Sequence, residues 1–231
     1  MRIPSGVSGF DSLTDGGFPE GRLYILSGPP GSGKTTFSAQ FLTKGYENGE
    51  RGLYVSMHET RAGIIQDMSG YEFGFDRAMQ DTRVHFLDAL GSEGKRFFGS
   101  PGERVDRNSL VNRLVGFVES RGIDRVVVDS TMLLRYLMDD DENTVMRFLN
   151  ALKRTDATTL LISEMTDPSA YSDEHFLAHG VIFFHNYLKD DQMRRGIQVV
   201  KMRGTPVDTD IHQFSFTPAG IVIEPETQAE K

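Results

Sequence analysis

Residues 28 to 36 combine glycines, a lysine and hydroxyl side chains at the spacing that binds phosphate groups. They contain the pattern Gly28-x-x-x-x-Gly33-Lys34-Thr35. Glycines let the backbone turn tightly, so that successive N–H groups surround an anion. Lys34 is placed to reach the β and γ phosphates of a nucleotide, and the Thr35 hydroxyl to bind Mg²⁺. The pattern therefore predicts a phosphate-binding loop (P-loop) for ATP and Mg²⁺.

The elements on either side of the loop fit this purpose. Residues 22 to 27 form a short apolar run that predicts a strand, and residues 34 to 47 have the apolar spacing of an amphipathic helix. A helix that begins at the loop points the positive end of its dipole at the bound anion. A glycine-rich turn without a ligand is the alternative, but it does not require the complete pattern. The predicted nucleotide-binding residues are Gly28, Pro30, Gly31, Ser32, Gly33, Lys34, Thr35 and Thr36.

A second candidate for the same site is Asp129, which ends the β-branched run of residues 125 to 129. Such a run is typical of a buried parallel strand. An aspartate there can simply begin a turn. With a complete P-loop upstream, we instead predict that Asp129 and Thr35 together hold Mg²⁺.

The rest of the chain predicts an α/β fold with a central, mostly parallel, twisted sheet flanked by helices. The last third is rich in strands separated by polar turns, which predicts an antiparallel C-terminal β extension. Nothing resembles a linker between two cores, so we expect one domain over residues 1–231, with an N-terminal approach over 1–21 and a flexible tail over 224–231. The further predicted strands are 53–57, 84–90, 158–163, 181–188, 196–202, 211–216 and 220–223, and the further helices are 60–69 and 105–121.

Composition excludes several classes of site. The chain has no cysteine, which excludes disulfides, zinc–thiolate sites and thiol catalysis. It shows no signal peptide and no apolar run of 18 residues, so we expect a cytoplasmic protein without a membrane partner. Its formal net charge of -8 gives no overall attraction for DNA.

Two stretches carry a resemblance to a known family. Residues 5 to 22 read Ser-Gly-Val-Ser-Gly-Phe-Asp-Ser-Leu-Thr-Asp-Gly-Gly-Phe-Pro-Glu-Gly-Arg, and residues 201 to 205 read Lys-Met-Arg-Gly-Thr. With the P-loop, they resemble the KaiC-like and RadA-paralogue branch of the RecA-superfamily P-loop ATPases, in the form of a single archaeal-type KaiC domain. The resemblance covers nearly the whole chain. It implies a RecA-like fold, Mg²⁺-dependent ATP hydrolysis and a homo-oligomeric ring, a hexamer, with active sites at subunit interfaces.

The resemblance also implies catalytic roles for Glu59, Lys34, Lys201 and Arg203. In the family the last two reach the γ-phosphate of the neighbouring subunit; the alternative is two solvated charges on an edge strand. The family commonly has two adjacent acids after the second strand, where this chain has His58 and Glu59. Either Glu59 orients the attacking water, or hydrolysis is weak and the protein senses nucleotide. A third interpretation makes Glu59 an acid at a helix N-terminus.

Three functions remain open from the sequence. The leading one is a regulatory or signalling ATPase that acts on an unknown regulatory protein, and another is a nucleotide-sensing module with little hydrolysis. A RadA-paralogue recombination mediator would bind single-stranded DNA through its channel loop. Residues 165 to 178, at that place, carry Asp167, Asp173 and Glu174 and no lysine or arginine, so DNA binding is not favoured.

Overall fold

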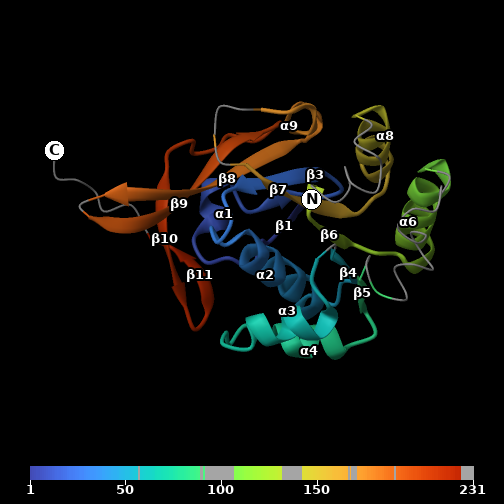
Figure 1. Ribbon diagram of the computed structural model, residues 1–231, viewed down its shortest axis with the longest axis horizontal. Helices are drawn as coiled ribbons and strands as arrows, with labels where there is room; N and C mark the ends of the chain where they lie inside the picture. Colours follow the sequence, from blue (N-terminus) through green and yellow to red (C-terminus); the bar gives the residue numbers. More distant parts are fainter. Residues whose placement is uncertain are drawn as a thin grey trace.

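The computed structural model describes residues 1–56, 58–88, 91, 107–131, 142–165, 167, 171–189 and 191–224. Within them, one large sheet has the order β11-β10-β9-β8-β3-β7-β6-β4-β5 (Figure 1). Its strands are β3 (Leu23–Gly28), β4 (Gly52–Ser56), β5 (Val84–Asp88), β6 (Arg125–Asp129), β7 (Thr158–Glu164), β8 (Gly180–Lys189), β9 (Gln192–Met202), β10 (His212–Thr217) and β11 (Gly220–Ile223).

The sheet changes character at β8. The strands from β5 to β8 pair in parallel, and β9, β10 and β11 continue the sheet in antiparallel pairs. Strands β3, β4 and β6 are buried along their whole length, as expected for parallel strands covered on both faces. The predicted α/β class and the antiparallel C-terminal extension are therefore confirmed.

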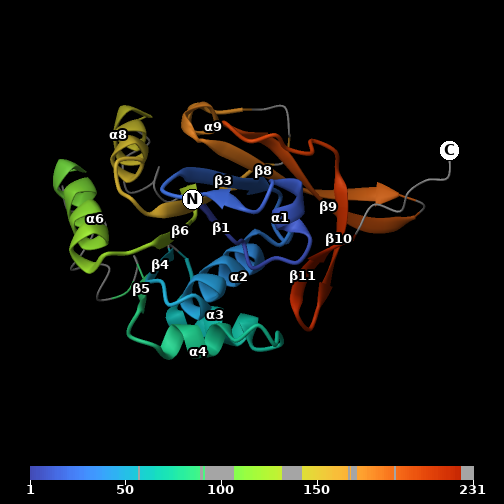
Figure 2. The same ribbon diagram turned by 180° about the vertical axis from the view of Figure 1, so that it is seen from behind.

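Helices cover both faces of the sheet (Figures 1 and 2). Strand residues alternate between two apolar clusters: Tyr24 and Leu26 point into one, and Leu23 and Ile25 into the other. The first cluster is covered by α2 (Lys34–Glu47), α3 (Arg61–Met68) and α4 (Phe75–Gln80). The second is covered by α6 (Arg107–Arg121) and α8 (Glu142–Leu152), which packs against α9 (Asp173–Leu177).

The N-terminal approach packs onto the helix that follows the P-loop. It forms β1 (Arg2–Ile3), the short helix α1 (Phe10–Leu13) and β2 (Phe18–Pro19). Phe10 and Phe18 are fully buried, and both contact the ring of Phe37 on α2 edge-on. Aromatic pairs of this kind add to the area that they bury, so the approach holds α2 against β3.

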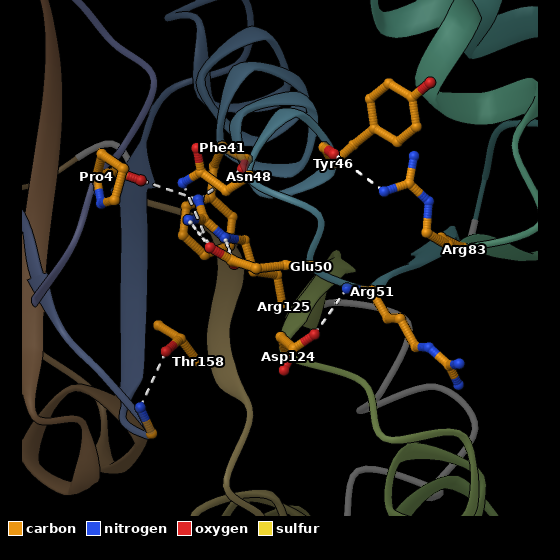
Figure 3. Close-up of polar contacts among 11 residues, drawn as sticks. Pro4, Phe41, Tyr46, Asn48, Glu50, Arg51, Arg83, Asp124, Arg125 and Thr158 are labelled. Carbon is orange, nitrogen blue, oxygen red and sulfur yellow. Dashed lines mark hydrogen bonds and ion pairs between the residues drawn. The ribbon is translucent and has the colours of Figure 1, made fainter. Parts of the chain in front are cut away.

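The amino ends of the strands carry a separate polar cluster (Figure 3). Arg125, the first residue of β6, is fully buried and pairs with Glu50 at 2.5 Å. Its guanidinium also donates to the carbonyls of Pro4 and Phe41, both at 2.8 Å, and lies over the Phe41 ring. A buried guanidinium needs such partners. This cluster links the N-terminal residues, α2 and β6 at the amino ends of the strands, whereas the P-loop follows the carboxyl end of β3.

Some sequence expectations differ from the structure or fall outside the described residues. No helix was predicted between residues 69 and 105 or over residues 165 to 178, so the short helices α4 and α9 were missed. The predicted flexible tail lies outside the described residues except for Glu224. No helix among the described residues has the length and apolar character needed to span a membrane.

Candidate nucleotide-binding site

The P-loop connects β3 to α2, and glycine is required at both of its ends. Gly28 has φ 145°, and a Cβ at this position would collide with the Phe184 carbonyl of the neighbouring strand. Gly33 has φ 103° and is the N-cap residue of α2, with no side-chain capping bond. Residues other than glycine rarely adopt these positive φ angles. The loop backbone therefore turns tightly, and α2 begins directly at the end of the loop, as predicted.

Lys34, the first residue of α2, points back over the loop. It is 6% exposed, and its Nζ donates to the carbonyls of Gly28 and Pro29 at 2.8 and 2.9 Å. Burial lowers the pKa of Lys34, and the negative charges of Glu164 and Asp129 oppose this shift. The ammonium group is thus held inside the loop, where the sequence predicted a phosphate-binding cation.

The predicted Mg²⁺ ligands lie together at the ends of two elements. Thr35 Oγ1 is 3.3 Å from Asp129 Oδ2, and the Tyr54 hydroxyl donates to the same oxygen at 2.8 Å. Burial raises the pKa of Asp129, whereas hydrogen bonds from Tyr54 and Thr35 and the charges of His58 and Lys34 lower it. Several donors therefore surround a carboxylate that is 4% exposed.

The donor set fits a nucleotide and a hard cation. Ser32 in the P-loop is fully buried, and its Oγ has no hydrogen-bond partner among the described residues. An orphaned hydroxyl in a phosphate-binding loop is suited to a bound phosphate oxygen. Thr35 and Asp129 supply a hydroxyl and a carboxylate oxygen, which are the ligand types that Mg²⁺ prefers. Both groups were predicted from the sequence.

Two further carboxylates, Glu59 and Glu164, lie at or just after the carboxyl ends of strands. The sheet register aligns Gly28 with Glu164 and Ser56 with Asp129, so the end of β7 lies beside the start of the P-loop and the residues after β4 follow a position beside Asp129. Glu59 is exposed, and a Cβ at Gly63 would come within 2.8 Å of its Oε2. The Glu59 carboxylate thus lies against the first turn of α3. This position is consistent with the helix-terminus interpretation, while Glu164 is the carboxylate whose charge raises the pKa of Lys34.

Lys201 and Arg203 share a single acceptor. Lys201 Nζ and Arg203 Nη2 both contact the Phe176 carbonyl of α9, at 3.4 and 2.8 Å. Lys201 lies in β9 and Arg203 just beyond its end at Met202, so the pair is not wholly on a strand. Within one chain, Lys201 and Arg203 contact α9, whereas the P-loop leads into α2. The pair and the P-loop therefore lie in different places.

The same region gathers two more cations, which sequence reasoning did not single out. Lys153 Nζ donates to the Leu177 carbonyl at 3.1 Å, and Arg22 Nη1 donates to the Arg203 carbonyl at 2.6 Å. Burial and the charges of Lys153, Arg22 and Arg203 lower the pKa of His179 to about 4. Within the described part of the chain, none of the four cations pairs with a carboxylate. We call Arg22, Lys153, Lys201 and Arg203 the cation cluster.

Tyr54 and His175 are polar groups whose roles emerge only in the fold. Tyr54 lies in a fully buried strand, where a hydroxyl needs a partner. A tyrosine inside an apolar strand was thus the signal available in the sequence, but it does not identify Asp129 as the partner of the hydroxyl. His175 is 2% exposed and forms a hydrogen bond with the Ser27 hydroxyl at 2.7 Å. Residue 175 therefore ties α9 to the strand that leads into the P-loop.

Comparisons with known proteins show which family the chain belongs to. A family model described as "ATPase: KaiC" matches residues 3–228. The chain is 32% identical over 239 residues to the circadian clock protein KaiC3 of Synechocystis sp., covering 99% of this chain and 46% of the relative. It is 30% identical over 230 residues to the circadian clock oscillator protein KaiC of Parathermosynechococcus lividus, covering 96% and 42%. The chain thus spans less than half the length of these curated relatives.

A solved structure extends the likeness to the whole fold. The KaiC-like protein of the hyperthermophilic archaeon Pyrococcus horikoshii OT3 matches with a TM-score of 0.84 and 30% identity, covering 97% of this chain and 99% of that one. This match confirms the predicted RecA-like α/β fold. From the family match over residues 3–228, the chain belongs to the KaiC family of ATPases.

Proposed function

We propose that this chain binds ATP with Mg²⁺ on its P-loop and hydrolyses it at the interface between neighbouring copies of itself. The observation that carries the proposal is the contact of Thr35 with Asp129, 3.3 Å apart, beside the buried Lys34. A hydroxyl, a carboxylate and an ammonium group at the end of a glycine-rich loop form a complete set of groups for a nucleotide and its cation. The proposed role of the assembly is regulatory, through a protein partner.

Each group has a defined task in this proposal. Lys34 binds the β and γ phosphates, and the N–H groups of the loop bind the remaining phosphate oxygens. Thr35 and Asp129 would hold the Mg²⁺ ion. Bound Mg²⁺ would neutralise negative charge on the phosphate oxygens. Glu59 is proposed to orient the attacking water, and Glu164 is the alternative residue for this role.

The cation cluster supports a role for a second subunit. Met202 pairs with Gly180, which pairs with Tyr24 near the amino end of β3. A parallel strand rises about 3.3 Å per residue, so Gly28 lies roughly 13 Å further along β3. The cluster also faces α9, whereas the P-loop leads into α2. No carboxylate among the described residues pairs with it, so its charge suits an anion brought by another molecule, and we propose the nucleotide of a neighbouring copy.

The proposal predicts that ATP turnover depends on protein concentration. Mg²⁺-dependent turnover per subunit should rise with concentration and then level off, because each site needs a residue from its neighbour. Phosphate release and sedimentation would be measured on the same dilution series. Turnover that is constant and fast at every concentration would contradict the shared site. ATP binding with background turnover throughout would instead support a nucleotide sensor.

Replacing one of the two carboxylates should identify the residue that orients water. We expect Glu59→Gln to lower turnover about a hundredfold, since positioned acid–base groups contribute factors of this size. The affinity for ATP should change little, because Glu59 is not part of the phosphate-binding loop. Glu164→Gln is the matched variant, measured by single-turnover hydrolysis and nucleotide titration. If Glu164→Gln alone shows the loss, Glu164 orients the water and Glu59 is only an acid beside the N-terminus of α3.

A further inference from the structure

A tyrosine supports the carboxylate of the candidate Mg²⁺ site. Tyr54 lies on β4 and is fully buried, with its ring stacked on Phe86 at 5.6 Å and 12°. Its hydroxyl donates to Asp129 Oδ2 at 2.8 Å. The register places Tyr54 beside Val127 on the neighbouring strand β6, two residues before Asp129. The ring contact and the sheet therefore fix the hydroxyl at the carboxylate.

The arrangement makes one carboxylate oxygen a shared acceptor. Oδ2 of Asp129 faces both the Tyr54 hydroxyl and Thr35 Oγ1, the latter at 3.3 Å. A phenol is not the kind of oxygen that commonly binds Mg²⁺, whereas carboxylates are. Groups that hydrogen-bond metal ligands orient them, and losing such a group typically lowers metal affinity by one to two orders of magnitude. Tyr54 is thus placed to act through Asp129.

We infer that Tyr54 is a positioning residue that orients Asp129 to hold the Mg²⁺ of the bound nucleotide. The inference rests on the proposed function, because it concerns the cation of the same site. It assigns Tyr54 no contact with the nucleotide. Loss of its hydroxyl should therefore weaken the effect of Mg²⁺ and leave Mg²⁺-free nucleotide binding unchanged.

The test is Tyr54→Phe, which removes the hydroxyl and keeps the ring on Phe86. The probe is a fluorescent ATP analogue, titrated first in EDTA and then with MgCl₂ at a fixed analogue concentration. We expect the half-saturating Mg²⁺ concentration to rise about tenfold. The affinity in EDTA should match the wild type, which also shows on the same sample that the P-loop is folded.

The matched control is Tyr24→Phe. Tyr24 is also fully buried, but its hydroxyl donates to the Pro19 carbonyl at 2.7 Å, away from the site. This variant should keep the wild-type Mg²⁺ dependence. If Tyr54→Phe also keeps it to within about twofold, or shifts it no more than Tyr24→Phe does, the inference is wrong. Wild-type protein that binds the analogue without any effect of Mg²⁺ would overturn the Mg²⁺ site and the role of Tyr54 together.

Discussion

Replacing Lys34 with alanine should abolish ATP turnover, with a loss of at least about a thousandfold. Lys34 is the one P-loop side chain with a positive charge, and its ammonium group lies inside the loop at 2.8 Å from the Gly28 carbonyl. In the proposed site this charge would interact with the phosphate groups in both the ground state and the transition state. We therefore expect nucleotide affinity to fall as well, by roughly a hundredfold. Both losses are measured by nucleotide titration and by phosphate release.

Lys44→Ala is the matched control for this variant. Lys44 lies on the same helix, but its side chain is 38% exposed and pairs with Glu47 at 3.0 Å. An exposed pair contributes little to stability, so this variant should bind and hydrolyse ATP as the wild type does. Thermal unfolding without nucleotide would show that both variants are folded. If the Lys34→Ala protein still binds ATP with wild-type affinity, the proposed role of the P-loop in binding the nucleotide is wrong.

The parts of the fold that local signals determine were predicted closely. Helix α2 was predicted over residues 34 to 47 and has these bounds, because Gly33 begins it and Asn48-Gly49 ends it. Strand β6 was predicted to end at Asp129, since a β-branched run needs burial on both faces. The missed α4 is too short for an apolar period to show, although Phe75, Ala78 and Met79 are all buried.

The contacts between distant segments were not predictable in the same way. Whether Tyr54 bonds Asp129 depends on β4 pairing with β6 in one register, and no feature near either residue specifies this. The cation cluster joins residues from β9 and the turn after it, from the approach to β3 and from the position just after α8. Local patterns identify residues suited to a chemistry, but the sheet order decides which of them meet.

Replacing Arg203 should produce the second large loss, about a thousandfold in turnover, while ATP binding stays close to that of the wild type. Among the described residues of its own chain, the Arg203 guanidinium donates only to the Phe176 carbonyl, at 2.8 Å. If it acts on the nucleotide of a neighbour, its absence removes transition-state charge stabilisation and leaves the P-loop intact. Lys201→Ala should show a smaller loss of the same kind. Arg194→Ala, on the same strand β9, is the control and should be fully active.

Mixing two inactive variants tests whether the site is shared. In a ring with head-to-tail contacts, Arg203→Ala supplies an intact P-loop and Lys34→Ala supplies an intact Arg203. Random mixing in equal amounts pairs these two in roughly a quarter of the interfaces. We therefore expect the mixture to recover up to about that fraction of wild-type turnover, after subunits have exchanged. A mixture that stays inactive, although sedimentation shows mixed oligomers, would mean that Arg203 acts within its own chain. The cation cluster would then need an anionic partner other than a neighbouring nucleotide.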